Sequence, residues 1–260
     1  MKRIALLSLL LSVPFFIGCK EEVKPKPKVT YEEEDTKVTI KKEAPRVDTT
    51  QIKIADLPVH MEGTEYLIHP IGDIRIYGKG SKIYGSSRTN NISYAISNYN
   101  RFEITGYFKN LKFQHIDSTA LYSLVDKQMQ IQKATYLNTV ARRQVLVYEL
   151  VDYDTNHDDK IDDNDIKSLY ISDISGRNFQ KLSQDMQELI DWNVVEVQNK
   201  LYYRTIEDIN KNGAFDENDK VHYYYVDLLS AEWEITDYKP VAIIKTESDE
   251  VKEIDSTSSK

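Results

Sequence analysis

The sequence has few of the residues that cross-link or break a chain. It contains one cysteine, nine glycines and seven prolines in 260 residues. A single cysteine excludes a disulfide framework and a zinc site built from the thiolates of one chain. The formal charge of −8 excludes the basic surface on which affinity for DNA or RNA depends, so no nucleic-acid partner is expected.

Motifs of common enzyme classes are also missing. The chain has no His-Glu-x-x-His, no Gly-x-Ser-x-Gly and no glycine loop that could hold a phosphate. The five histidines are His60, His69, His115, His157 and His222, and no two of them have metal-ligand spacing. The protein is therefore predicted not to be an enzyme.

Tyrosine is common instead, with 18 residues, and it favours strands. Apolar residues alternate with the period of strands between turn residues, and no long segment has the period of a helix. Only short stretches such as residues 183–191 could be helical. We predict an all-β fold with strands at residues 73–77, 110–116, 144–151, 200–206 and 221–228.

An internal repeat refines this prediction. A shift of 54 residues places Leu146-Val147-Tyr148 over Lys200-Leu201-Tyr202, and residues 169–173 over residues 223–227. Each copy is a strand, an acidic loop, a strand, a turn and a short strand. Two earlier segments, 64–108 and 109–143, share the strand spacing without the loop. Such units resemble β-propeller blades, so a partial or small propeller is expected, with a β-sandwich as the alternative.

The amino terminus has the features of a secretion signal. Met1-Lys2-Arg3 is basic, and an almost wholly apolar run follows as far as Ile17. The run ends in Gly18-Cys19, which resembles a bacterial lipobox, where the cysteine is lipidated and becomes the first mature residue. Residues 1–18 are predicted to be the signal peptide and Cys19 the membrane attachment point.

The residues after Cys19 are charged and contain several prolines. Lys20-Glu21-Glu22 looks like the export tag of surface lipoproteins in the Bacteroidota. Residues 19–61 are predicted to be a disordered tether and residues 245–260 a disordered tail, because neither can bury enough apolar area to fold. One β domain would occupy residues 62–244. Display at the cell surface is favoured over the periplasmic face of the outer membrane.

Two acidic loops occupy the same place in the repeat, at residues 154–165 and 208–219. Both fit the twelve-residue EF-hand calcium loop, with oxygen-bearing side chains at positions 1, 3, 5, 9 and 12. Calcium takes six to eight oxygen ligands, which alternate side chains of a tight loop can supply. Two calcium sites are therefore predicted. A first loop that starts at Asp152 is conceivable, but it places Asp159 at the apolar position 8.

The predicted ligands follow from this register. In the first loop they are Asp154, Asn156, Asp158, the carbonyl of Lys160, Asp162 and Asp165. In the second loop they are Asp208, Asn210, Asn212, the carbonyl of Ala214, Asp216 and Asp219. Position 6 needs a backbone turn, which Gly213 makes easily and for which Asp159 is one of the few other tolerated residues.

The sequences around the loops indicate which calcium family they resemble. Asp at position 12 and the Asp-x-Asn-x-Asp/Asn pattern are similar to dockerin loops, but the flanks are β-type runs and not amphipathic helices. The arrangement looks more like the strand-loop-strand calcium sites in propeller blades of integrin α subunits. That resemblance implies structural calcium, and it does not imply a receptor role.

These observations predict a surface lipoprotein whose β domain, stiffened by two calcium ions, serves in binding or assembly. Its partner, a protein or a glycan, is not specified by the sequence. The alternatives are a propeller-type hydrolase or peptidase, or an accessory subunit of one, and a dockerin-like adhesion module. The last would need helices after each loop.

Overall fold

A computed structural model describes residues 26–31, 51–75, 94–95, 102–138 and 143–241. The predicted signal peptide, Cys19 and the predicted tail lie outside these residues. The described strands are β1 (Gln51–Ala55), β2 (Val59–His60), β3 (Tyr66–Arg75), β4 (Tyr94–Ala95), β5 (Glu103–Phe108), β6 (Asn110–His115), β7 (Tyr122–Ser123), β8 (Gln130–Tyr136), β9 (Val145–Val151), β10 (Ser168–Asp173), β11 (Gln180–Lys181), β12 (Gln187–Val195), β13 (Lys200–Glu207), β14 (Lys220–Asp227) and β15 (Ile235–Asp237).

The all-β prediction is confirmed for the described residues. Their one helical element is a short 3₁₀ turn, η1 (Glu196–Gln198). Within the described residues, no helix is long and apolar enough to cross a membrane. The strands predicted at 110–116, 144–151, 200–206 and 221–228 correspond to β6, β9, β13 and β14.

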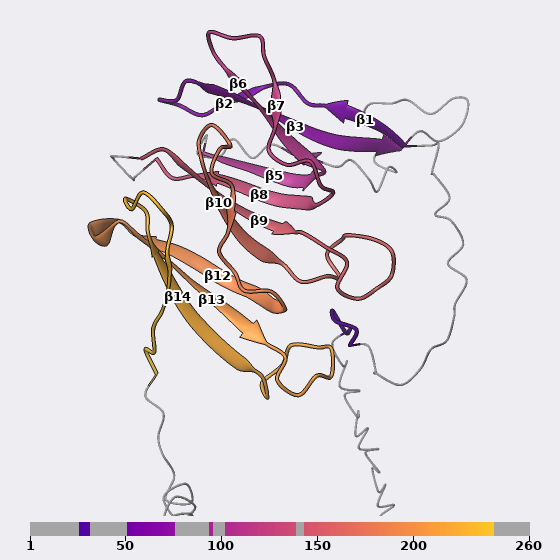
Figure 1. Cartoon of the computed structure of the whole chain (residues 1–260). Helices are drawn as coiled ribbons and strands as arrows, with labels where there is room; N and C mark the ends of the chain where they lie inside the picture. Colours follow the sequence, from indigo (N-terminus) through magenta and orange to yellow (C-terminus); the bar gives the residue numbers. More distant parts are fainter. Residues whose placement is uncertain (1–25, 32–50, 76–93, 96–101, 139–142, 242–260) are drawn as a thin grey trace, which may run out of the picture.

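The strands form three antiparallel sheets that lie one over another (Figure 1). The first sheet has the order β1-β3-β6-β7, with β2 also paired to β3. The middle sheet has the order β11-β10-β9-β8-β5-β4, and the last has the order β12-β13-β14-β15. Within the described residues none of the sheets closes on itself. The propeller is therefore not confirmed, although the antiparallel all-β class is.

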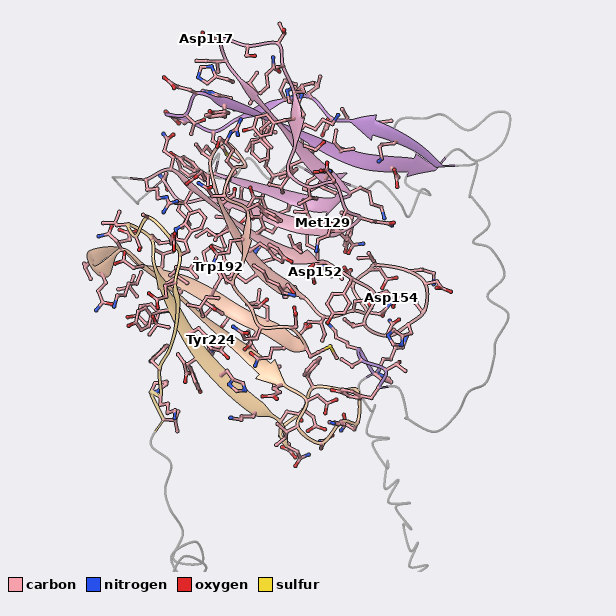
Figure 2. All side chains as sticks on the ribbon, in the orientation of Figure 1. Asp117, Met129, Asp152, Asp154, Trp192 and Tyr224 are labelled. Carbon is pink, nitrogen blue, oxygen red and sulfur yellow. The ribbon has the colours of Figure 1, made fainter. Side chains whose placement is uncertain are left out.

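The middle sheet is buried on both faces. In β9, Leu146, Tyr148 and Leu150 belong to the core shared with the first sheet, and Val145 and Val147 belong to the core shared with the last sheet. This division follows from the geometry of a strand, because successive side chains point to opposite faces. It also explains why β9 reads as an almost continuous apolar run. Figure 2 shows Trp192 of β12 between the middle and last sheets.

The repeat predicted from the sequence is present in the structure. In the middle sheet β9, the first acidic loop, β10 and β11 follow one another, and in the last sheet β13, the second loop, β14 and β15 do the same. The pairings are equivalent as well, since β9 pairs with β10 and β13 pairs with β14. Each loop therefore connects two paired, antiparallel strands of its own sheet.

Two predictions are wrong. Part of the expected tether is ordered, because β1 and β2 both pair with β3 and Met61 is fully buried in the core. Short edge strands with charged residues between their apolar ones resemble linker in composition, and only the pairing with β3 distinguishes them. The stretch 183–191 is not helical. Met186 has a φ of 62°, which a right-handed helix cannot contain, and β12 follows.

Because the middle sheet connects the two cores, the domain is expected to unfold in one transition. Leu150 is fully buried, and Leu150→Ala should lower the free energy of unfolding by about 3 kcal/mol through lost burial and the cavity left behind. Urea denaturation followed by tyrosine fluorescence and by circular dichroism measures both the number of unfolding transitions and the loss of unfolding free energy. Leu57→Ala is the control, since Leu57 is 78% exposed and should change stability little. Two separate transitions would contradict the shared middle sheet.

Candidate metal centres

The two predicted calcium loops lie next to each other at one end of the stack. The first joins β9 to β10 and the second joins β13 to β14. Because these strand pairs hold equivalent places in neighbouring sheets, the loops leave the sheets on the same side (Figure 1). The described segment 26–31 lies between them and is hydrogen-bonded to both.

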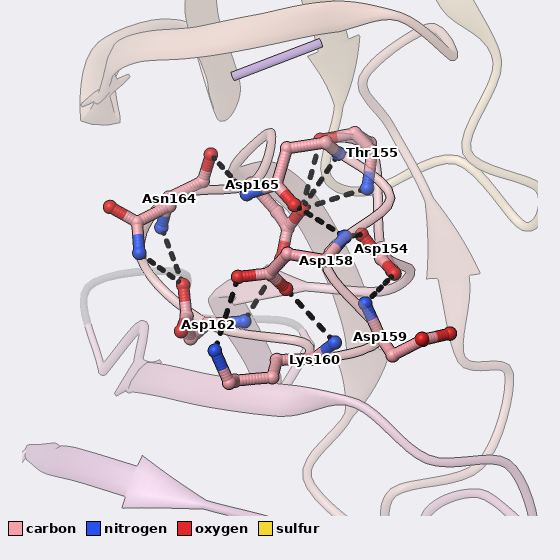
Figure 3. A network of polar contacts seen from close by, with 9 residues as sticks. Asp154, Thr155, Asp158, Asp159, Lys160, Asp162, Asn164 and Asp165 are labelled. Atoms are coloured by element: carbon pink, nitrogen blue, oxygen red, sulfur yellow. Dashed lines mark hydrogen bonds and ion pairs between the residues drawn. The ribbon is translucent and has the colours of Figure 1, made fainter. Parts of the chain in front are cut away.

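In the first loop the side chains are held by the loop's own backbone amides (Figure 3). Asp154 accepts hydrogen bonds from the N–H groups of Asp158, at 3.2 Å, and Asp159, at 2.8 Å. Asn156 accepts one from the N–H of Asp158 at 2.9 Å, and Asp158 accepts one from the N–H of Lys160 at 3.0 Å. Each bond folds the chain over a side chain two to five residues earlier, which makes a compact turn.

The second loop repeats this scheme position by position. Asp208 accepts from the N–H groups of Asn212, at 3.2 Å, and Gly213, at 2.7 Å. Asn210 accepts from the N–H of Asn212 at 2.9 Å, and Asn212 accepts from the N–H of Ala214 at 2.8 Å. Two stretches with different sequences thus adopt one backbone path.

Backbone angles agree with this similarity. Positions 4 and 6 have positive φ in both loops, at His157 (61°) and Asp159 (64°) in the first and at Lys211 (55°) and Gly213 (81°) in the second. The prediction that position 6 needs a left-handed turn, made by Gly213 in one loop and tolerated by Asp159 in the other, is confirmed.

The aspartate at position 12 of each loop accepts hydrogen bonds from backbone N–H groups near both ends of that loop. Asp165 is fully buried and accepts from the N–H of Thr155 at 2.7 Å and from the N–H of Asp162 at 3.0 Å. Asp219 does the same with the N–H groups of Ile209 and Asp216, at 3.2 and 2.8 Å. Figure 3 shows the side chains of Asp158 and Asp165 within the first loop. The structure therefore brings the two ends of each set of predicted ligands together.

The remaining side-chain ligands, at position 9, cap the end of each loop. Asp162 accepts from the N–H of Asn164 at 2.9 Å, and Asp216 accepts from the N–H of Asn218 at 2.8 Å. The hydrogen bonds from Asn218, chiefly the one from its backbone N–H, lower the pKa of Asp216 below its usual value. The carboxylates of Asp162 and Asp216 are therefore held in the last third of each loop, near the position-12 aspartate.

The structure favours Asp154 over Asp152 as the start of the first loop. Asp152 is buried at the end of β9 and accepts a hydrogen bond from the Tyr170 hydroxyl at 2.7 Å. It also pairs with Lys181 at 2.8 Å, and Lys181 pairs in turn with Asp185. With its carboxylate occupied by these partners, Asp152 serves the packing of the middle sheet. Figure 2 shows it beside the loop that contains Asp154.

The Asp152–Lys181 pair shifts both titrations. Burial would raise the pKa of Asp152, but the hydrogen bond and charge of Lys181, with the hydrogen bond of Tyr170, outweigh it and lower that pKa. Burial would likewise lower the pKa of Lys181, but its two carboxylate partners raise it. The pair is therefore charged at neutral pH and contributes to stability there.

The charge on the loops is largely not offset by cations. In the first loop Lys160 lies 3.3 Å from Asp158, and both side chains are exposed to solvent. Asp154, Asp162, Asp165 and, in the second loop, Asp208 have no ion pair within the part of the chain that the structure describes. Carboxylates gathered in this way favour a bound cation, which would relieve their mutual repulsion.

The donor set fits a hard cation in kind. Among the described residues no group of three or more His, Cys, Asp or Glu side chains is arranged to hold a metal ion. The aspartates predicted as ligands in the first loop accept hydrogen bonds from backbone N–H groups of the loop in this structure. The predicted sets combine such carboxylates with the amide oxygens of Asn156, Asn210 and Asn212 and with backbone carbonyls. Oxygen donors of this mixed kind are those that calcium accepts. The twelve ligand assignments stay predictions.

Sequence reasoning missed the part that segment 26–31 plays, because its Lys-Pro composition resembles a linker. Val29 is only 3% exposed, and the Tyr31 hydroxyl donates to Asp208 at 3.0 Å. Burial and this bond raise the pKa of Tyr31 to about 12. The one available signal was the run Val29-Thr30-Tyr31, three residues that favour extended structure directly after the prolines.

Comparisons with known proteins assign no family. No protein-family model matches the chain, and no curated protein sequence is significantly similar to it.

Removal of Lys181 should destabilise the protein by leaving Asp152 buried without its partner. We expect Lys181→Ala to cost about 3 kcal/mol of unfolding free energy at pH 7, measured by urea denaturation. The folded-state pKa of Asp152 is lowered, so the contribution of the pair is present above the ordinary value of 3.8 and is lost as the pH falls through the lowered value. The difference between wild type and variant should therefore narrow in acid. Lys53→Ala, at an exposed position, is the control, and a difference independent of pH would refute the role of the pair.

Proposed function

We propose that this protein is a lipid-anchored, surface-displayed bacterial protein whose β domain binds two structural calcium ions and serves in binding or assembly. The observation that carries the proposal is the position-by-position agreement between the two loops. Both hold Asp and Asn oxygens in the same backbone frame, with positive φ at positions 4 and 6. A shared frame in two different sequences argues for a shared ligand.

The chemistry of the loops favours calcium among the common metals. The predicted ligands are oxygens alone, with no thiolate and no imidazole, and hard divalent cations select such donors. Six aspartates between residues 154 and 165 would repel one another without a cation. Extracellular modules of this kind bind calcium with dissociation constants of about 10⁻⁴ to 10⁻³ M, which external calcium saturates. We infer a structural role for the ion.

The fold supports a blade-like architecture for the calcium units. The last sheet is a four-stranded meander, β12-β13-β14-β15, and the middle sheet carries the corresponding β8-β9-β10-β11 order within its six strands. We propose that these are two blade-like units of an open stack, a partial propeller in which each strand-loop-strand unit presents one calcium loop.

A tyrosine-rich surface supports a role in binding. Tyr202 and Tyr225 lie 5.5 Å apart between ring centroids on adjacent strands of the last sheet, and Tyr238 lies 5.5 Å from Tyr202. The ammonium of Lys200 lies 4.1 Å from the centre of the Tyr225 ring. These side chains are half-buried, and tyrosines of this kind are enriched at recognition surfaces because they combine a large apolar face with a hydroxyl. The partner would be a protein or a glycan.

The membrane anchor is supported by sequence alone. Gly18-Cys19 ends the apolar run, and the charged, proline-containing residues that follow suit a spacer between a lipid and a domain. A tag of the Bacteroidota type, Lys20-Glu21-Glu22, favours the cell surface over the periplasmic face. The absence of enzymatic activity stays a prediction.

Calcium should bind at two sites and stabilise the domain. At ten times the dissociation constant, each site should add about 1.4 kcal/mol to the free energy of unfolding. Titration calorimetry with calcium and thermal melting with calcium or EDTA measure these effects. Asp154→Asn and Asp208→Asn should each remove one site and about half of the shift, because each deletes a carboxylate at position 1.

Matched controls come from the same loops. Asp163→Asn and Glu217→Gln remove the same charge at position 10, where no ligand is predicted, and should leave both sites in place. Absence of calcium heat and an unchanged melting temperature in EDTA would refute the metal sites. Equal losses in control and test variants would show a general charge effect in place of coordination.

Replacement of Cys19 tests the anchor. Cys19→Ala removes the one thiol that can be acylated, so the protein should move from the membrane fraction to the soluble fraction, and labelled palmitate should no longer be incorporated. Phe16→Leu introduces the residue that is usual at this position of a lipobox and should retain membrane association and palmitate incorporation. Palmitate incorporation that persists without Cys19, or that is missing from the wild type, would refute lipidation at this residue.

A further inference from the structure

Residues 26–31, here called the strap, connect the two acidic loops. The N–H of Thr30 donates to the carbonyl of Thr155 at 3.0 Å, in the first loop. The N–H groups of Lys28 and Val29 donate to the carbonyl of Gly213, at 2.6 and 3.1 Å, in the second. The strap therefore bridges two loops that belong to different sheets and that lie more than 50 residues apart in sequence.

Side chains reinforce this bridge. The Thr155 hydroxyl donates to the carbonyl of Lys28 at 2.6 Å, and the Lys28 ammonium pairs with Glu188 of β12 at 2.8 Å. Val29 is almost fully buried. A Cβ on Gly213 would lie 2.4 Å from the carbonyl oxygen of Val29, so the strap packs against the loop at a place that only glycine leaves open.

Most hydrogen bonds of the strap go to groups that are not predicted calcium ligands, namely the carbonyls of Thr155 and Asn156, at positions 2 and 3, and of Gly213, at position 6. The exception is the Tyr31 hydroxyl, which donates to the carboxylate of Asp208, at position 1, at 3.0 Å. The carbonyls predicted to bind calcium are those of position 7, Lys160 and Ala214. Cation and strap can thus occupy the same loop together, and both require the same backbone path.

We propose that the strap and the two loops form one calcium-linked unit, in which calcium binding docks the strap and the docked strap tightens calcium binding in both loops. This inference rests on the proposed calcium function. Without a cation, repulsion among the loop carboxylates would disturb the path that places the carbonyls of Thr155 and Gly213 for the strap. By linkage, a strap that binds the calcium-loaded loops must raise their affinity by the same factor.

The strap lies close to Cys19 in the chain, so its docking would limit the distance between the domain and the membrane. Seven residue steps separate Cys19 from Lys26, which limits the distance between lipid anchor and docked strap to about 25 Å. From Cys19 to Gln51, where β1 begins, there are 32 steps, or about 110 Å when extended. Docking of the strap would hold the domain near the membrane, and its release would extend the reach of the domain.

Amide hydrogen exchange of the full chain tests the docking. In calcium the amides of Lys28, Val29 and Thr30 should be protected, and in EDTA their exchange should accelerate by at least about tenfold. The amides of β9 should stay protected in both conditions and serve as the internal control.

Titration calorimetry tests the reverse effect. Val29→Asp should weaken calcium binding at both loops by about tenfold and leave the stoichiometry at two. Thr30→Pro is an independent variant, since it removes the N–H that donates to Thr155. Lys26→Ala is the matched control in the same segment, at an exposed residue that has no hydrogen bond or ion pair to the described residues of the loops, and should bind as wild type does.

The outcomes separate this inference from the proposed function. Calcium binding by the wild type with EDTA-sensitive protection of the strap and weaker binding by Val29→Asp would support the coupling. Two calcium ions bound with strap protection unchanged in EDTA, or with wild-type affinity in Val29→Asp and Thr30→Pro, would overturn the coupling and leave the calcium sites intact. No calcium binding by the wild type would overturn both.

Discussion

The burial of the middle sheet on both faces is the constraint on which the rest of this structure depends. Leu146, Tyr148 and Leu150 pack toward the first sheet, and Val145 and Val147 pack toward the last. One strand therefore contributes to two cores, and it fixes the spacing of all three sheets. Since β9 and β13 occupy corresponding places in adjacent sheets, the same packing brings their following loops together at one end of the molecule.

The two loops then combine a hydrogen-bonded backbone frame with carboxylates that have few cationic partners among the described residues. Their backbone amides point at carboxylates and Asn oxygens in the same order, so the turns are specified by short-range bonds. In the described part of the chain only Lys160 forms an ion pair with a predicted ligand, Asp158, whereas Asp152, two residues before the first loop, is paired with Lys181. This contrast distinguishes a carboxylate used in packing from carboxylates that a cation would hold. The strap is hydrogen-bonded to both loops.

Prediction from the sequence succeeded where short-range physics decides the structure. Alternating apolar residues located β6, β13 and β14, a short apolar run located β9, and the 54-residue repeat placed both loops between paired strands. The left-handed turn at Asp159 and Gly213 followed from residue type. Prediction failed where pairing partners decide. The composition of the edge strands β1 and β2 predicts a tether, and that of residues 183–191 permits a helix. Both become strands because they pair with β3 and β13, and local composition does not specify these partners.

The sequence by itself determined the all-β class, the repeat and the path of each acidic loop, because strand alternation and Asx turns depend on neighbours in the chain. Tertiary structure alone decided that the loops lie side by side, that Asp152 belongs to the core and that Val29 is buried between the loops. These features depend on contacts between residues far apart in the chain, such as Asp152 with Lys181 and Thr30 with Thr155. No local pattern encodes such a contact, since it arises only when three sheets stack and the strap meets both loops at their shared edge.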